Sequence, residues 1–135
     1  MADVTVVAAD VRPLGGCIIR RFTAGEALTF GIPVYLSAAN TVSKADGSAV
    51  ATACCIGVVV AGALGNSSVA SGEECDVVVF GPVAGYSTNM AFGSKFYVDD
   101  DAGIIADAAG TKSTIIGVGL SGAVLLVNPQ YVGLA

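Results

Sequence analysis

The residue types that most often perform chemistry in proteins are sparse in this sequence. Histidine is absent, and the 135 residues include four cysteines and 11 acidic side chains. Without histidine, the Ser–His and Cys–His pairs that activate a nucleophile are excluded, as are metal sites built on imidazole. No C-x-x-C spacing occurs, which argues against a zinc knuckle or a thioredoxin-type motif. We therefore predict no catalytic residue, no metal, no cofactor and no enzymatic activity.

The remaining clusters lack the spacing that a ligand site needs. Asp99–Asp101 is the densest acidic run, with Gly103 just after it. An EF-hand loop needs alternating acidic positions, so we predict a solvated hairpin tip here instead of a calcium site. The acidic pair Glu73–Glu74 is predicted to be solvated as well. The glycine-rich runs Gly62–Gly65 and Gly81–Gly85 lack the lysine of a phosphate-binding loop.

The cysteines are expected to be structural. They are Cys17, Cys54, Cys55 and Cys75. The N-terminal residues lack a basic start and place Asp3 and Asp10 around a short apolar run, so no export signal is expected. In a reducing compartment, four free and mostly buried thiols are the simplest interpretation. A Cys17–Cys75 disulfide stays open.

Charge and hydropathy limit the partners. The six basic and 11 acidic residues give a net charge of −5, and nucleic-acid binding needs clustered Lys and Arg. The longest apolar stretches, Ala53–Leu64 and Ile115–Val127, are interrupted by glycine and rich in β-branched residues, which favours strands over a membrane span. We expect neither nucleic acid nor a membrane as partner. The mean hydropathy of +0.77 favours burial in an oligomer or a larger assembly.

The pattern predicts an all-β fold, a small β-barrel or sandwich. Its 18 glycines separate short runs of Val, Ile, Thr, Tyr and Phe. The predicted strands are Val4–Ala8, Cys17–Phe22, Pro33–Leu36, Val42–Lys44, Cys54–Val60, Cys75–Phe80, Lys95–Val98, Ile104–Ala106, Ile115–Leu120 and Ala123–Val127. Ser48–Ala53 and Ala106–Ala109 are each predicted to form one helical turn at most. We expect one β domain, 16–135, behind an extended N-terminal arm, 1–15.

An internal repeat is the most informative feature. The matching blocks are 28–42 with 90–104, 56–62 with 116–122, and 76–82 with 123–129. The offsets are 62, 60 and 47, so the first copy is predicted to carry 13 extra residues around 63–74. This predicts two copies of one β unit, at about 28–82 and 90–129.

The repeat also predicts which positions are equivalent. The expected core positions are Ile56, Val58 and Val60 in the first copy and Ile116, Val118 and Leu120 in the second. The opposite face is also apolar, so these strands are expected to be buried on both sides or to pack on a partner subunit. Gly57 and Gly117 match each other, so each is predicted to lie at a barrel corner or at a crowded contact between the two units. Gly47 has no counterpart and is expected to act only through its own turn.

The N-terminal residues are the strongest candidates for an interface. Arg20 and Arg21 alternate faces in a strand, either as charges guarding a sheet edge or as an ionic anchor to an acidic partner. The arm ends at Pro13 and Gly15–Gly16, so we expect it to add to a neighbour's sheet edge. The predicted interface residues are Val4, Val6, Val7, Arg12, Arg20, Arg21, Leu64, Asn66 and Tyr131.

Five segments together carry a resemblance. They are Phe22–Leu36 with its G-I-P-V-Y-L ending, Ile56–Gly62, Val77–Pro82, Gly93–Val98 and Ile116–Gly122. In this order they resemble the small β-barrel decoration, or cement, proteins of tailed-bacteriophage capsids and prophages.

The resemblance covers about residues 20–129 and brings no catalytic residue. It implies a structural virion protein that binds the major capsid protein on the outer capsid surface and stabilises capsomer junctions. Its self-association would be as a trimer in preference to a dimer, after synthesis in the bacterial cytoplasm. The alternative is a tail- or baseplate-associated β module, or a receptor- or glycan-binding domain, which exposed aromatics in a groove would favour.

Overall fold

The computed structural model describes residues 4–62, 67–86, 92–112, 114–121 and 123–130. The fold is all-β, as predicted. The elements are a 3₁₀ turn (Ala8–Asp10), β1 (Arg12–Pro13), β2 (Ile18–Ala24), β3 (Leu28–Thr29), β4 (Pro33–Ala38), β5 (Thr41–Lys44), α1 (Val50–Ala53), β6 (Cys55–Gly62), β7 (Ser68–Val69), β8 (Glu74–Ala84), β9 (Lys95–Val98), β10 (Ile105–Ala106), β11 (Ile115–Ser121) and β12 (Val124–Gln130).

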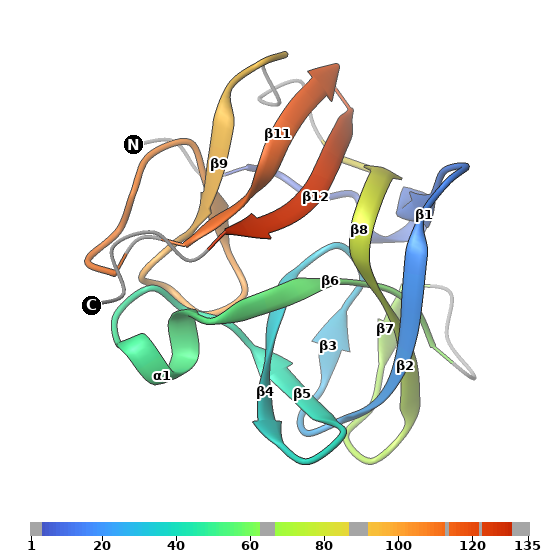
Figure 1. Ribbon diagram of the computed structural model, residues 1–135. Helices are drawn as coiled ribbons and strands as arrows, with labels where there is room; N and C mark the ends of the chain where they lie inside the picture. Colours follow the sequence, from blue (N-terminus) through green and yellow to red (C-terminus); the bar gives the residue numbers. More distant parts are fainter. Residues whose placement is uncertain (1–3, 63–66, 87–91, 113, 122, 131–135) are drawn as a thin grey trace.

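Five strands form a closed barrel. Its order is β2, β5, β4, β6 and β8, and β8 returns to β2. The pairings are antiparallel except where Thr23 and Ala24 of β2 run parallel to β5. Closure pairs the main chain of neighbouring strands around the ring, which removes most of the free sheet edge. In Figure 1 this barrel is the lower half of the molecule.

A second unit shares β8 with the barrel. The first half of β8 pairs with β2 and β6, and its last residues, Gly81–Ala84, pair with β12. From there the order continues through β11 and β9 to β10. Figure 1 shows β8 running from the lower barrel toward β12 in the upper unit.

The two units repeat the same register where β4 meets β6 and where β9 meets β11. In the first unit the facing pairs are Pro33↔Val58, Val34↔Gly57 and Tyr35↔Cys55. In the second they are Lys95↔Val118, Phe96↔Gly117 and Tyr97↔Ile115. Each unit skips one residue, Ile56 or Ile116, which is a β-bulge at the same place. The registers of the two units therefore match at the predicted offsets of 62 and 60.

The third matching block is displaced by one residue from the prediction. Val58 faces Val78 in the first unit, and its equivalent Val118 faces Leu126 in the second. The true offset is 48, not 47, so the first copy is 12 residues longer, the difference between 60 and 48. Runs such as Val-Val-Val and Val-Leu-Leu look alike when slipped by one residue, although such a slip turns every side chain to the other face.

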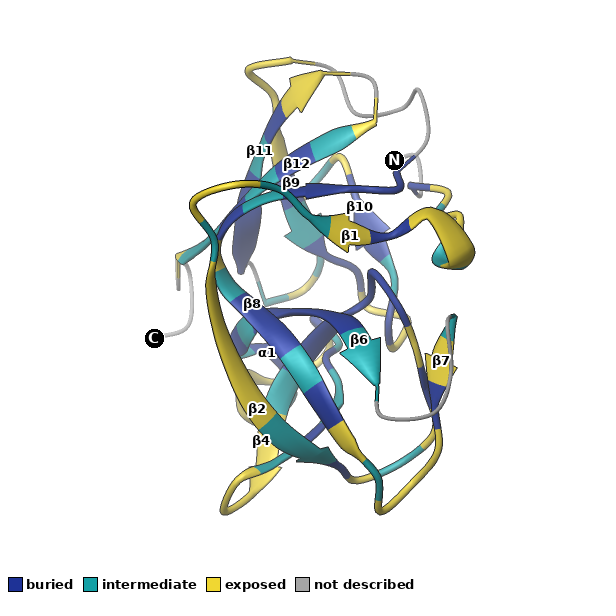
Figure 2. Ribbon diagram, turned by 90° about the vertical axis from the view of Figure 1, so that its right-hand side faces the viewer, coloured by how far each residue is buried: buried dark blue, intermediate teal, exposed yellow. Residues whose placement is uncertain are grey.

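The core fills the barrel and continues into the second unit. In β6, the residues Cys55, Val58 and Val59 are fully buried, so burial of this strand on both faces is confirmed. The predicted core face is wrong at the end of β11, because Leu120 is 47% exposed. Val60, the equivalent residue of β6, follows the same bulge and is buried, because β6 lies in the closed barrel whereas β11 lies in the second unit. Figure 2 shows β8 mostly buried beside an exposed β2.

Three local expectations meet mixed outcomes. The single helical turn predicted within Ser48–Ala53 is α1, whereas Ala106–Ala109 forms no helix. The predicted strand Val4–Ala8 is wrong: Val6 makes one isolated bridge to Tyr86, and a 3₁₀ turn begins at Ala8. The chain there leaves the sheet because its main-chain bonds are divided between two different partners, one at each end of the segment.

Candidate functional site

The two buried cysteines are poor candidates for a nucleophile. All four thiols are free, with Cys55 and Cys75 buried and Cys17 and Cys54 half-buried. Burial raises the pKa of Cys55 to about 12 and that of Cys75 to about 11. Both thiols are therefore protonated at neutral pH, whereas a cysteine nucleophile acts as the thiolate.

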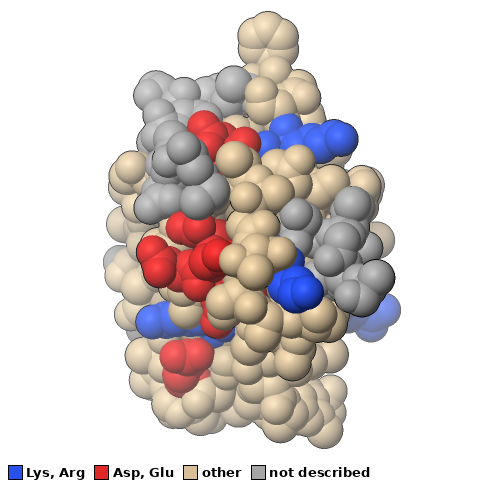
Figure 3. Space-filling model, turned by 90° about the vertical axis from the view of Figure 1, so that its left-hand side faces the viewer, with Lys and Arg blue, Asp and Glu red and all other residues tan. Residues whose placement is uncertain are grey.

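The acidic tip between β9 and β10 is tied to other loops, which corrects part of the prediction. Asp99 is only 4% exposed, so it is not solvated. The Asp100 carboxylate accepts bonds from the Thr111 main-chain N–H (2.8 Å) and hydroxyl (2.6 Å). Within the described residues, no group of three or more acidic or cysteine side chains is placed to hold a metal ion. Acidic side chains gather on this side of the molecule in Figure 3.

Gly47 ties the first unit to the tip. The Gly47 N–H donates to the Asp99 carbonyl (2.7 Å), and the Gly47 carbonyl accepts from Lys112 N–H (2.7 Å). A Cβ on Gly47 would lie 2.8 Å from the Val98 carbonyl oxygen. The expectation that Gly47 acts only through its own turn is therefore wrong, because this turn packs between two loops of the other unit.

The carboxylate of Asp46 organises the same turn from within. Burial disfavours its charged form, but hydrogen bonds from Ser48 and Thr52 outweigh this and lower the pKa of Asp46. Ser48 donates through both its main-chain N–H and its hydroxyl. The role of this carboxylate is to shape the loop, since its acceptor capacity is spent on the loop itself.

A groove on the barrel wall contains the ion pairs that Arg21 forms with two acidic residues. It has a volume of about 480 Å³ and is lined by Arg21, Gly62, Glu73, Glu74, Cys75 and Asp76. Arg21 Nε donates to Asp76 (3.0 Å), and its Nη1 lies 3.7 Å from Glu74. The hydrogen bond to Asp76 is the main cause of the raised pKa of Arg21. The Arg21 side chain is 67% exposed, so these ion pairs contribute little stability.

The sequence predicts a solvated Glu73, whereas in the structure this side chain is bound to a turn. Its carboxylate accepts the Ala70 N–H at 2.8 Å and so closes the turn before β8. The groove therefore contains carboxylates that are committed to a turn or to Arg21, beside a protonated thiol. It offers no pair of groups for acid–base or nucleophilic work.

Sequence reasoning missed an exposed apolar surface on the barrel. Ile18 and Phe80 face each other across β2 and β8 and are 52% and 42% exposed. Ile19, the next residue of β2, is 43% exposed. We call these three residues the apolar strip. The available signal was Ile-Ile directly before Arg-Arg in one short strand, which places exposed apolar and charged side chains together.

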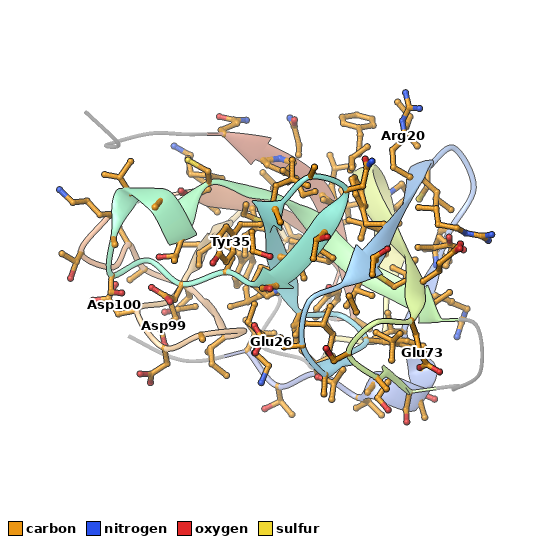
Figure 4. All side chains as sticks on the ribbon, turned by 90° about the horizontal axis from the view of Figure 1, so that it is seen from below. Arg20, Glu26, Tyr35, Glu73, Asp99 and Asp100 are labelled. Carbon is orange, nitrogen blue, oxygen red and sulfur yellow. The ribbon has the colours of Figure 1, made fainter. Side chains whose placement is uncertain are left out.

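The predicted basic residues do not form one cluster. Arg12 of β1 faces Ala84, and Arg20 of β2 faces Val77, seven residues away along β8. At the rise of a strand this is roughly 23 Å. Arg20 projects outward from β2, next to the apolar strip in sequence, as Figure 4 shows. Over Ile18–Phe22, β2 is an edge strand, because among the described residues it pairs there with β8 alone.

The other predicted interface residues separate into three groups. Val4 is buried and Val6 is half-buried within the chain's own fold, whereas Val7 is 47% exposed. Leu64, Asn66 and Tyr131 lie outside the described residues. Contact of any of these residues with a partner stays a prediction.

Among the described residues, no helix is long and apolar enough to cross a membrane. No protein-family model matches the chain, and no curated protein matches it significantly.

Proposed function

We propose that this chain is a structural protein that binds the outer surface of an assembled phage capsid and reinforces the junctions between capsomers. The observation that supports it best is the apolar strip, held on the wall of a closed barrel beside Arg20. Its partners would be the major capsid protein and other copies of itself.

The strip has the chemistry of a contact surface. Large apolar side chains that stay exposed beside charged ones are typical of the core and rim of protein interfaces. Ile18 and Phe80 are a directly paired set on two neighbouring strands, so their side chains emerge on one face. Because the barrel is closed, little ordering of the backbone is needed when this face binds.

The charges around the strip favour an acidic or polar neighbour. Arg20 follows Ile19 in β2 and extends outward from the barrel (Figure 4), whereas Arg21 is engaged by Asp76 and Glu74. A single patch of this size binds weakly, but many copies on one shell act together when they are linked to each other. Reinforcement of a shell requires such repeated contacts and no chemical step.

Binding to shells tests the proposal. Purified chain is mixed with capsids of the phage that encodes it, prepared without the chain, and the bound fraction is measured by sedimentation. The variant Ile18→Ser/Phe80→Ser should bind at least about tenfold less. The matched control is Leu36→Ser, because Leu36 is 49% exposed on another strand. All variants should melt within a few degrees of the parent.

Two results would contradict the proposal. One is binding of the strip variant equal to that of the parent chain. The other is a low copy number, measured by quantitative mass spectrometry of intact virions. Hundreds of copies per particle support decoration of the shell, whereas a few dozen or fewer would place the chain on the tail.

A further inference from the structure

The two units are closed in different ways. In the first, β2 pairs with β8 and also with β5, which closes the barrel. In the second, the last residues of β8 occupy the place of β2, because Val83 faces Leu125 just as Arg20 faces Val77. The strand equivalent to β5 is β10. Residues 4–7 fill the space between the end of β8 and β10.

Main-chain hydrogen bonds hold residues 4–7 in this slot. The Val4 N–H donates to the Ile105 carbonyl (2.8 Å) on one side. On the other side the Val7 N–H donates to the Gly85 carbonyl (2.9 Å), and Val6 forms an antiparallel bridge with Tyr86. The predicted arm then continues as β1, which runs along β8, and the Leu14 N–H donates to the Pro82 carbonyl.

Two glycines form notches for the arm. A Cβ on Gly31 would lie 2.6 Å from Val6 and 2.9 Å from Val11, and a Cβ on Gly85 would lie 2.6 Å from the Val11 Cα. Both glycines have positive φ, 92° and 113°. The body of the fold is therefore shaped to receive a segment with valines at these spacings, which is the sequence of this chain's own arm.

The arm is attached to the body by a short link with open surroundings. A Cβ on Gly15 or Gly16 would meet no atom within 4 Å, and Gly16 has φ +88°. Beyond the link, β2 is held by its own ladder of pairs with β8. Leaving the slot therefore requires a change at the link and leaves the barrel pairing intact.

We propose that the slot is a strand-acceptor site whose second occupant is the arm of another copy of this chain. An arm from another molecule makes the same hydrogen bonds and fills the same notches, so exchange changes few contacts and is limited by concentration. The attached arm has an effective concentration on the order of millimolar for a short link. Exchange should therefore increase steeply where copies are crowded. It requires no capsid and is independent of the proposed function.

Cysteine trapping between two different variants detects the exchange. Arg12 and Ala84 are facing residues of β1 and β8. One chain carries Arg12→Cys and the other Ala84→Cys, so a 12–84 disulfide joins two molecules only when an arm is exchanged. The chains are mixed from micromolar to millimolar concentration with glutathione disulfide, and the linked peptides are identified by mass spectrometry.

Matched controls calibrate the trap. The double variant Arg12→Cys/Ala84→Cys should form the bond within one molecule and give the maximum yield. A partner with Ser37→Cys, an exposed position on β4, measures random oxidation together with the native thiols. Exchange predicts a 12–84 heterodimer at least about tenfold above the Ser37→Cys background at millimolar concentration, falling on dilution.

A peptide gives a second reading that needs no disulfide. A fluorescent peptide with the sequence of residues 1–14 should bind the full chain saturably, and a peptide with Val4→Asp and Val6→Asp should not. Either a concentration-dependent 12–84 heterodimer or specific peptide binding supports strand exchange. Background trapping together with no specific peptide binding at 1 mM overturns it.

Discussion

Adding one methyl group at Gly57 or Gly117 should be among the most damaging small changes in this chain. A Cβ at Gly57 would overlap the Val78 carbonyl oxygen, and one at Gly117 would overlap the Leu126 carbonyl oxygen. Both obstacles are main-chain atoms of the neighbouring strand, so no side-chain rotation relieves them. Each glycine directly follows a bulge residue, Ile56 or Ile116, in a buried strand.

The magnitude follows from what must move. To admit the methyl group, β6 must separate locally from β8, or β11 from β12. That weakens about two ladder hydrogen bonds at about 1 kcal/mol each, and overpacking adds about 1–3 kcal/mol. Gly57→Ala and Gly117→Ala should therefore each destabilise by about 3–5 kcal/mol. In a chain of this length, that lowers the melting temperature by about 10–18 °C.

Thermal melts followed by circular dichroism measure the effect. The matched control is Gly15→Ala, because a Cβ there meets no atom within 4 Å. It should change stability by no more than about 0.5 kcal/mol. If Gly57→Ala and Gly117→Ala melt with the Gly15→Ala control, the inferred contacts with the neighbouring carbonyls are refuted. If only one of the two is affected, the units are not equivalent at this position.

Three further changes test other parts of the structure. Because burial raises the pKa values of Cys55 and Cys75 above 9.0, unfolding releases protons above about pH 9. The melting temperature should fall as the pH rises through 9 to 11, and the fall should be less steep in Cys55→Ala/Cys75→Ala. Because Asp46 has a lowered pKa, Asp46→Asn should lower the melting temperature at pH 7. The difference in melting temperature from the parent, measured by calorimetry, should shrink as the pH falls below about 4. Tyr86→Phe removes a hydrogen bond to the Gly31 carbonyl (2.8 Å) and should cost about 1–2 kcal/mol in urea unfolding. Equal stability of Tyr86→Phe and the parent would show that this hydrogen bond contributes no net stability.

Local patterns were enough to predict most of the strands and the repeat. The predicted strand Lys95–Val98 has the same bounds as β9. The matching of Gly57 with Gly117 is also correct, because each glycine follows the bulge of its strand and is easily recognised in the sequence. The slip in the third block has the opposite cause. Where Val78 and its neighbours are all apolar, nothing in the residue types fixes which of two adjacent positions faces which partner.

Long-range arrangement was out of reach of those patterns. The burial of Asp99 depends on loops from the other unit, and the exposure of Ile18 depends on which strands lie beside β2. The placement of the arm also depends on a space in the second unit that no local pattern describes. Such features are set by tertiary contacts between segments far apart in sequence, and composition supplies no signal for them.

The sharing of β8 makes the repeated chain indivisible. The first part of β8 pairs in the barrel, its last residues, Gly81–Ala84, pair in the second unit, and Arg12 and Pro13 from before the barrel strands pair with that same end. Loss of β8 in one unit therefore removes paired main chain from the other, and we expect one sharp calorimetric transition for the whole chain. Tension applied between the two units would pass along a single continuous backbone. Two separately folded domains would be joined by a linker, whereas here one hydrogen-bonded strand runs through both units.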